Sequence, residues 1–351
     1  MRSAEYADVS VVIPTRDRRA LLAQTVAHVL AQRSVAIELV VVDDGSEDGT
    51  SEWVQGIDDE RVSLVRGGGR GVAAARNLGL AQAQAPLVAF NDDDDLWAPD
   101  KLVTQVAALQ RCPRARWICS AAVRVNDDLR VIAAERVWTH GDVSTVALAG
   151  NPVPGGASGV VADTGLVREV GGFDERFHIL ADWDLWARLA MESDMAAVDR
   201  PLHAYRIHSG GMSSGVATTR REIALFEEKY ADERRRRSVS LNMPRLNYWM
   251  ADRAQRSGDR LGAAGAFIQG RSIVGRSRGV TRAVEALLWP SGYRARDRRR
   301  GRQVDADWLA EVFTWLPVDP ARSLGGVAAA GLVGRAPQSR LPQLRSRRRV
   351  R

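Results

Sequence analysis

A short apolar segment that ends in four consecutive aspartates constrains the fold of this chain more than any other feature. Residues 85–90 are apolar apart from the chain-restricting Pro86, which is typical of a buried strand, and Asp92–Asp95 follow directly after one asparagine. Four like charges in a row repel one another unless positive charge lies among them. In open α/β sheets, ligands bind at the carboxyl ends of the strands. The segment therefore predicts either a site for a divalent cation with a phosphorylated substrate or a solvated acidic turn before the next helix.

The surrounding sequence alternates apolar strands with helices. Apolar, β-branched runs predict strands at 9–14, 37–42, 62–65, 116–123 and 198–205. Apolar residues at helical spacing predict helices over 17–32, 47–55, 72–83 and 101–110. Such alternation implies parallel β-α-β units with right-handed crossovers, and continuous apolar strands imply a sheet covered on both faces. We therefore expect an α/β fold with a Rossmann-type, mostly parallel sheet flanked by helices.

The distribution of charge divides the chain into two parts. Residues 1–215 carry 21 basic and 30 acidic side chains, whereas residues 216–351 carry 29 basic and 13 acidic ones. The second part, which begins after a Gly/Ser-rich stretch, shows helical patterns and ends in a basic segment, 345–351, that we expect to be disordered. We therefore expect one larger domain over 1–215 and a smaller, arginine-rich, mainly helical region over 216–351.

Other features of the sequence narrow the class of protein. Two cysteines, Cys112 and Cys119, cannot form a disulfide framework, and they lack the spacing of a metal site. No apolar run reaches the roughly 20 residues that span a bilayer, and we see no signal peptide. These observations favour a cytoplasmic protein.

Seven short motifs occur in one order along the first part of the chain. They occupy residues 11–15, 42–46, 71–79, 90–97, 171–175, 182–186 and 205–208. Over residues 9–215 this set resembles the family 2 glycosyltransferases, which are inverting sugar-nucleotide enzymes of the GT-A fold. The resemblance implies a GT-A-like domain that moves a sugar from a nucleotide-diphosphate sugar to an acceptor hydroxyl.

The aspartate run matches the Asp-x-Asp motif of that family. Positions two apart on an extended backbone point the same way, so Asp92 and Asp94 can face one ligand. Mg²⁺ and Mn²⁺ prefer one or two carboxylates together with phosphate oxygens. The resemblance implies that Asp94 binds the metal, that Asp92 holds the ribose or the waters of the metal, and that His208 is a third ligand or a pyrophosphate contact. His208 is equally well explained as a polar surface residue.

Residues near the first two strands are expected to bind the nucleotide. By resemblance, Asp43 and Asp44 reach the nucleoside, and Pro14 and Thr15 line the base pocket. An ordinary Asp-Gly turn also explains the aspartate pair. Arg76, at the head of its helix, is expected to pair with phosphate or with the aspartates, or else to form a surface salt bridge.

Asp182 is the candidate general base. A single displacement at the anomeric carbon requires a group that takes the proton of the acceptor hydroxyl. Asp182 near the start of a helix suits that role, although aspartate is also a favoured helix cap. The family's usual Glu-Asp pair is interrupted here because Ala181 replaces the glutamate, and Asp184 is the fallback base.

Two further residues are candidates for contact with the acceptor or the sugar. Trp183 has the flat apolar surface on which a sugar ring stacks, but core packing explains a tryptophan at this position as well. Asp174 either lines the acceptor site or has a structural role.

The sequence thus predicts an inverting glycosyltransferase that uses Mn²⁺ or Mg²⁺, with a UDP-sugar as the favoured donor. The alternative is a catalytically inactive protein that binds sugar nucleotides or polyanions. The basic region over 216–351 predicts contact with the inner face of an anionic membrane that carries lipid-linked acceptors, or else a solvated basic face or an oligomer contact. Nucleic acid is an unfavoured partner because no nucleic-acid-binding module is present.

Overall fold

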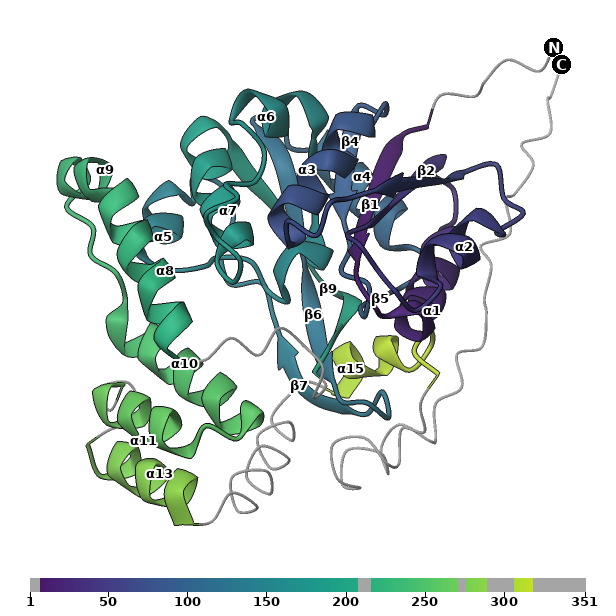
Figure 1. Cartoon of the computed structure of the whole chain (residues 1–351). Coiled ribbons are helices and arrows are strands. Elements are labelled where there is room, and N and C mark those ends of the chain that lie inside the picture. The colour runs from purple at the N-terminus through teal and green to yellow at the C-terminus, as the bar shows by residue number, and fades with distance from the viewer. Residues whose placement is uncertain (1–6, 208–215, 271–275, 289–305, 318–351) are drawn as a thin grey trace, which may run out of the picture.

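The computed structural model of the chain describes residues 7–207, 216–270, 276–288 and 306–317. These residues form a nine-stranded sheet in the order β3-β2-β1-β4-β8-β6-β9-β5, and β7 pairs with β6 outside this path. The sheet stands in the middle of the molecule, with helices on both faces (Figure 1). This arrangement confirms the expected α/β class.

The elements alternate along the first part of the chain as expected. The strands are β1 (Val9–Thr15), β2 (Ile37–Asp43), β3 (Val62–Arg66), β4 (Leu87–Phe90), β5 (Leu96–Trp97), β6 (Ala115–Val125), β7 (Val131–Glu135), β8 (Val160–Asp163) and β9 (Asp194–Arg206). The helices between them are α1 (Arg19–Leu30), α2 (Thr50–Gln55), α3 (Val72–Gln82), α4 (Lys101–Gln110), α5 (Ser144–Ala149), η1 (Gly156–Gly159), α6 (Thr164–Glu169) and α7 (Ala181–Glu192).

The register of the parallel strands brings their carboxyl ends to one edge. Strand β1 pairs with β2 and β4 in parallel, and the register aligns Thr15 with Asp43 and Val12 with Phe90. The residues that follow β1, β2 and β4 therefore emerge side by side. This edge is where the sequence predicts the acidic site.

The second half of the sheet is mixed, which the sequence did not indicate. Strand β8 lies antiparallel between β4 and β6, while β6 pairs in parallel with β9. Strands β5 and β7 are also antiparallel to their neighbours. Strands β5 and β8 have only two and four residues, too few for a clear alternation of apolar and polar positions.

Side chains of the central strands alternate between two apolar layers. Val11 and Ile13 pack with α1, α2 and α4, whereas Val12 packs on the opposite face with α3 and α7. Because successive side chains of a strand point to opposite faces, an apolar run such as β1 fills both layers.

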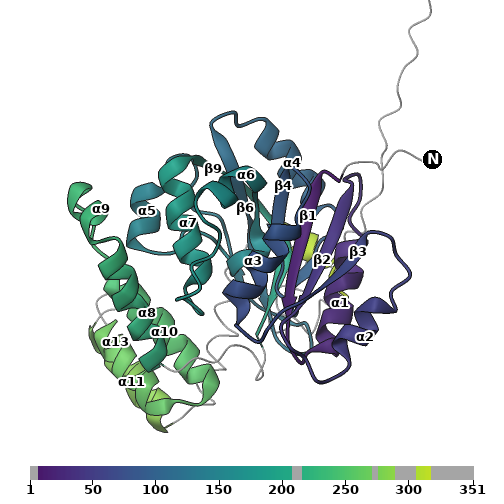
Figure 2. The same cartoon turned by 45° about the horizontal axis from the view of Figure 1, so that its top comes forward.

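The helices of the second part extend one of these layers. They are α8 (Val216–Lys229), α9 (Ala231–Arg236), α10 (Met243–Ser257), α11 (Arg260–Gln269), α13 (Arg276–Leu288) and α15 (Ala306–Val312). Figure 2 shows α8, α10, α11 and α13 gathered on the side of the sheet that α5 and α7 cover. Phe226 of α8 stacks on Trp183 of α7 with ring centroids 4.2 Å apart, and both belong to one continuous core. The two parts that charge distinguishes in the sequence therefore share a core.

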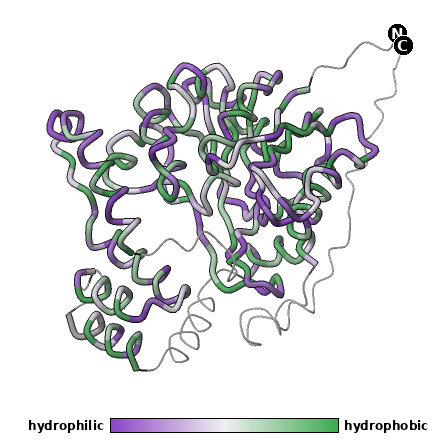
Figure 3. The backbone as a smooth tube through the Cα atoms, in the orientation of Figure 1, coloured by the Kyte–Doolittle hydropathy of each residue, from purple (hydrophilic) through white to green (hydrophobic). Residues whose placement is uncertain are grey.

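Apolar residues concentrate along the central strands, and the helices outside the sheet carry both polar and apolar residues (Figure 3). Cys112 and Cys119 are both free, as expected. Within the described ranges, none of the helices has the length and apolar character needed to cross a membrane. His208 and the basic segment at 345–351 lie outside the described residues.

Candidate active site

A cleft of about 940 Å³ opens at the carboxyl edge of the parallel strands. Most of the residues that the sequence singles out contribute to its wall. They are Pro14, Thr15, Asp44, Arg76, Asp92, Asp94, Asp182 and Trp183. The aspartates that follow β2 and β4 and the aspartate of α7 therefore share one cleft, as the sequence predicts.

Arg18 neutralises two carboxylates of the aspartate turn. Its Nη1 atom lies 3.1 Å from Asp93 Oδ1 and 3.0 Å from Asp94 Oδ2. Thr15 Oγ1 donates a second hydrogen bond to Asp93, 2.8 Å long. Burial and the neighbouring charge of Asp94 raise the pKa of Asp93 to about 7, against the opposing effect of Arg18. Sequence analysis missed Arg18, whose only local signal is a position three residues after β1.

Arg76 neutralises the third carboxylate, Asp92. Arg76 is 3% exposed and donates from Nη2 to Asp92, so the alternative of a surface salt bridge is wrong. Its guanidinium also lies 5.1 Å from the centre of the Phe173 ring. The next residue, Asn77, holds the backbone of Phe173 with two hydrogen bonds of 2.8 Å. Two motifs that lie far apart in the sequence, 71–79 and 171–175, thus support one wall of the cleft.

Asp95 holds the aspartate turn in place through buried hydrogen bonds. Asp95 is fully buried and accepts hydrogen bonds from Ser158 Oγ at 2.5 Å and from the backbone N–H of Arg206 at 2.9 Å. Burial raises the pKa of Asp95 well above the ordinary value. Ser158 also accepts from the backbone N–H of Asp92 at 3.1 Å. Asp95 is therefore a scaffold residue that joins the aspartate turn to the loop before β8 and to the end of β9.

The aspartate pair after β2 divides into one structural and one cleft residue. Asp43 accepts from the Ser46 N–H at 2.9 Å and from the Ser51 hydroxyl. Asp43 is not among the described residues that line the cleft. Asp44 lines the cleft and accepts from the N–H of Gly71 at 2.7 Å. Asp44 is therefore the member of the pair that remains a candidate for the expected nucleoside contact, and the turn interpretation fits Asp43.

Asp182 occupies the second position of α7 and faces the cleft. Its Oδ1 atom accepts from the Trp183 N–H at 2.7 Å. Burial raises the pKa of Asp182 to about 6, while the positive charge of Arg76 opposes the shift. The N-cap residue of α7 is Leu180, so the alternative of Asp182 as the cap is wrong.

Glu222 of α8 holds the turn that precedes Asp182. Its carboxylate accepts from the N–H groups of His178, Ile179 and Leu180 at 3.1, 2.9 and 2.9 Å. Leu180 is the N-cap residue of α7, so these three N–H groups belong to the turn that leads into the helix. Sequence analysis missed this residue because it lies 40 positions after Asp182 in a segment that the motifs do not cover.

Two other acidic candidates belong to an ion-pair cluster outside the cleft. Asp184 is fully buried and lies 2.7 Å from Arg188 and 2.6 Å from Lys229, which removes it as a fallback base. Asp174 lies 2.8 Å from the same lysine and pairs with Arg176 at 2.6 Å. Asp174 is not among the described residues that form the cleft wall, so its contacts fit a structural role.

Trp183 is 1% exposed and serves mainly as a packing residue. Its indole N–H donates to the carbonyl of Ala147 at 2.6 Å, and its ring stacks on Phe226. Only an edge of the side chain therefore remains for the cleft.

Asp92 and Asp94 are the described residues that fit a divalent metal. Both line the cleft, and their hard carboxylate oxygens suit Mg²⁺ or Mn²⁺, whose other positions phosphate oxygens and water fill. Within the described part of the chain, no group of three or more His, Cys, Asp and Glu side chains forms a ligand set by itself. His208, the expected third ligand, lies outside that part.

Comparison with solved structures shows the class of fold. Residues 1–349 of TarS from S. aureus, in complex with UDP-GlcNAc, superpose with a TM-score of 0.55 at 16% sequence identity, over 93% of this chain and 88% of that one. The fold is that of the GT-A glycosyltransferases.

Sequence comparison adds a family match for part of the chain. Residues 10–143 match the model of glycosyl transferase family 2, so this part of the chain is similar to that family.

Two curated relatives match a part of the chain. The putative teichuronic acid biosynthesis glycosyltransferase TuaG of Bacillus subtilis is 42% identical over 101 residues, which are 28% of this chain and 40% of TuaG. The UDP-Glc:alpha-D-GlcNAc-diphosphoundecaprenol beta-1,3-glucosyltransferase WfgD of Escherichia coli is 33% identical over 102 residues, 29% of this chain and 40% of WfgD. The chain spans between 36% and 40% of the length of such relatives.

The contacts of Glu222 generate a prediction about stability. We expect Glu222→Ala to lower the free energy of unfolding by about 2–4 kcal/mol, because three backbone N–H groups lose their shared acceptor and the Glu222–Leu180 bond is buried. Urea denaturation monitored by circular dichroism measures this change. Glu228→Ala, an exposed glutamate of the same helix, is the matched control and should change the free energy by less than about 0.5 kcal/mol. Equal effects of the two substitutions would contradict the role of Glu222.

Proposed function

We propose that this protein is an inverting glycosyltransferase that moves a sugar from a nucleotide-diphosphate sugar to an acceptor hydroxyl with the help of Mn²⁺ or Mg²⁺. The observation that supports the proposal is the shared cleft, in which Asp92 and Asp94 face the same space as Asp182. A metal-binding acidic pair and a separate carboxylate with a raised pKa are the two groups that a single displacement requires.

The donor is proposed to occupy the edge formed by β1, β2 and β4. Pro14, Thr15 and Asp44 would surround the nucleoside, and Arg76 would lie near the diphosphate. Asp94 and Asp92 would hold the cation, which neutralises the diphosphate as it leaves. The name of WfgD specifies UDP-Glc and the TarS structure contains UDP-GlcNAc, which supports a UDP-sugar as the donor.

Asp182 is proposed to act as the general base. The acceptor oxygen forms a bond to the anomeric carbon while the bond from that carbon to the diphosphate oxygen breaks. The electron pair of the broken bond leaves with the diphosphate, and the hydroxyl proton passes to the Asp182 carboxylate. A pKa near 6 keeps this carboxylate ionised at neutral pH yet more basic than an ordinary aspartate.

A catalytically inactive sugar-nucleotide-binding protein is the alternative. The reason to consider this alternative is that Ala181 replaces the glutamate of the family's Glu-Asp pair. The position of Asp182 in the cleft, beside the charges of Arg76 and Asp92, favours the enzyme. Turnover decides between the two.

The donor site is tested by ligand binding. We expect UDP with Mn²⁺ to raise the melting temperature and UDP with EDTA to raise it much less, because the cation joins diphosphate to carboxylate. Asp94→Asn should weaken binding of UDP with Mn²⁺ by about ten-fold or more, since it removes one charged ligand. Exposed Asp128, replaced by Asn, is the control and should leave binding unchanged. No stabilisation by UDP, GDP or dTDP with either metal would contradict the proposed function.

The general base is tested by kinetics. Asp182→Asn should lower kcat by about 10² to 10⁴ while UDP still binds, because proton removal is lost and the donor contacts remain. Because the pKa of Asp182 is raised to about 6, the active carboxylate is present above that pH, and wild-type kcat/KM should fall as pH drops through about 6. Glu192→Gln, at the exposed end of the same helix, is the control. A kcat within a factor of two of wild type for Asp182→Asn would rule out this base.

We also propose that the protein associates with the inner face of an anionic membrane. Helix α13 exposes Val280, Val284 and Leu287 along one side, at 51%, 47% and 37% exposure. The region that contains this helix, 216–351, carries 29 basic and 13 acidic residues. An apolar stripe within a basic region is typical of a surface that binds anionic lipid.

Flotation with vesicles tests this association. We expect the protein to float with vesicles that contain phosphatidylglycerol at low salt and to be released at high salt, because screening weakens attraction between exposed charges. The double variant Val280→Asp/Val284→Asp should reduce flotation. Ala224→Asp, at an exposed position of α8, should not. Lack of flotation at low salt, or equal flotation of the double variant, would end the proposal.

A further inference from the structure

The cleft continues beyond the proposed donor site into a second, basic end. This end is formed by β6, by β7 with the segment that follows it, and by α10. Its charged and aromatic residues are Arg124, Glu135, Arg136, Trp138, Arg245, Trp249, Asp252 and Arg253. We refer to these eight residues as the basic end. It contains four arginines and two carboxylates, whereas the remainder of the cleft wall contains six aspartates and four arginines.

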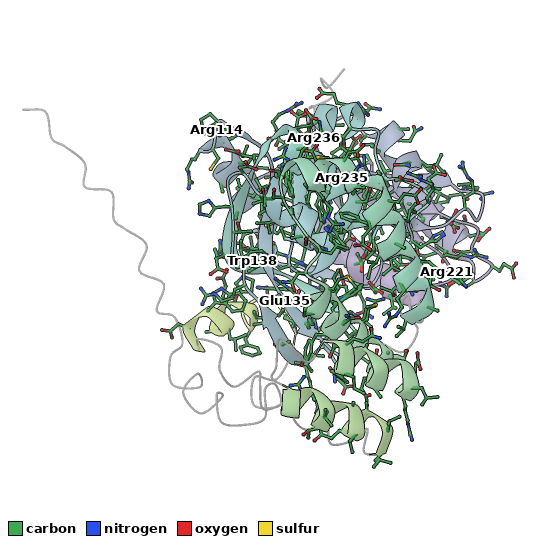
Figure 4. All side chains as sticks on the ribbon, turned by 90° about the vertical axis from the view of Figure 1, so that its left-hand side faces the viewer. Arg114, Glu135, Trp138, Arg221, Arg235 and Arg236 are labelled. Atoms are coloured by element: carbon green, nitrogen blue, oxygen red, sulfur yellow. The ribbon has the colours of Figure 1, made fainter. Side chains whose placement is uncertain are left out.

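Two arginines of the basic end lie over tryptophan rings. The Arg245 guanidinium lies 5.3 Å from the ring centre of Trp138, and that of Arg253 lies 5.1 Å from the ring centre of Trp249. Trp138 is 51% exposed, which is unusual for so large an apolar side chain. In Figure 4, Trp138 and Glu135 lie close together, well apart from Arg221 of α8.

The carboxylates of the basic end are directed to a different arginine. Glu135 pairs with Arg124, and Asp252 lies 3.7 Å from the same guanidinium. Arg136 pairs with Asp199. Arg245 therefore contributes positive charge that Glu135 does not offset. A guanidinium whose face covers a ring keeps its N–H groups at the edge of the plane, where they match two oxygens of a phosphate.

A chain of contacts joins the basic end to the proposed base. A Cβ atom at Gly156 would lie 3.5 Å from Asp182 Oδ2, so the loop before β8 passes directly beside that carboxylate. The N–H of the preceding residue, Gly155, donates to Glu135 Oε2 at 2.7 Å. Glu135 in turn pairs with Arg124. An acceptor held at the basic end would therefore enter the cleft on the side of Asp182.

We propose that the basic end is the acceptor subsite and that it binds an acceptor saccharide through a phosphate group attached to the sugar. The exposed part of Trp138 provides apolar surface for the saccharide, and Arg245, which lies over that ring, binds the phosphate. This inference rests on the proposed function, because it requires a donor in the acidic part of the cleft. A cleft with an acidic and a basic end matches one substrate that arrives with a cation and another that carries its own negative charge.

Binding of defined probes to the full chain with UDP and Mn²⁺ tests the subsite. The probes are the methyl glycoside of N-acetylglucosamine, its 1-phosphate, its glycerol phosphodiester and its diphosphate ester with a short alkyl chain. We expect the three phosphate-bearing probes to bind at least ten-fold more tightly than the neutral glycoside. Tightest binding of the phosphodiester assigns the phosphate to a glycan, and tightest binding of the alkyl diphosphate assigns it to a lipid headgroup.

Variants of one arginine make the test specific. Arg245→Gln should reduce the preference for phosphate-bearing over neutral probes by about ten-fold, because the charged fork is lost. Arg245→Lys keeps the charge without the fork and should recover part of the preference. Arg221→Gln removes an exposed arginine from α8 and should leave the preference at the wild-type value. Melting temperatures within about 2 °C of wild type would show that the variants remain folded.

Two negative results are distinguishable. If UDP binds with Mn²⁺ but the phosphate-bearing probes bind no better than the neutral glycoside, or if Arg245→Gln keeps the full preference, the acceptor subsite is overturned and the proposed function stands. If none of UDP, GDP and dTDP binds with either metal, the proposed function fails. If GDP or dTDP binds in place of UDP, the probes are measured with that nucleotide.

Discussion

The structure depends on how negative charge at one edge of the sheet is balanced. Parallel pairing of β1, β2 and β4 places Asp44 and the aspartate turn at the same edge. Arg18 lies within 3.1 Å of two carboxylates of that turn, and Arg76 pairs with a third. Buried or half-buried carboxylates this close together would otherwise shift toward their neutral form, as the raised pKa of Asp93 indicates. Arg18 and Arg76 therefore allow this edge of the sheet to keep its acidic side chains in the folded protein.

The helices of the second part are components of this site. Glu222 of α8 fixes the turn before Asp182, Lys229 of the same helix holds Asp184, and α10 provides one wall of the cleft. The continuous core between Phe226 and Trp183 explains how this support reaches α7. A division of the chain at residue 215 describes its charge but not its packing.

Local patterns predicted a large part of this arrangement. The apolar runs that became β1, β2, β3, β4 and β6 can be identified without knowledge of their neighbours. An aspartate cluster after a strand points to a sheet edge by topology alone. What the sequence did not indicate depends on contacts between distant segments. Arg18, Glu222 and Arg245 have no distinctive neighbours in the chain, and each acquires its role from residues more than 40 positions away. The assignment of Asp44 rather than Asp43 to the cleft depends on hydrogen bonds from Ser46 and Ser51, which composition does not reveal.

The central claim is that carboxylates of the aspartate turn bind a cation, which in turn binds the diphosphate of the donor. Anomalous diffraction at the manganese edge, from crystals grown with UDP and Mn²⁺, tests it most directly. The account predicts one strong peak within about 2.5 Å of an Asp94 carboxylate oxygen and of a diphosphate oxygen, with Asp92 at the same site directly or through water. Bound UDP with no manganese peak at Asp92 or Asp94, or a peak at a different group of side chains, would contradict it.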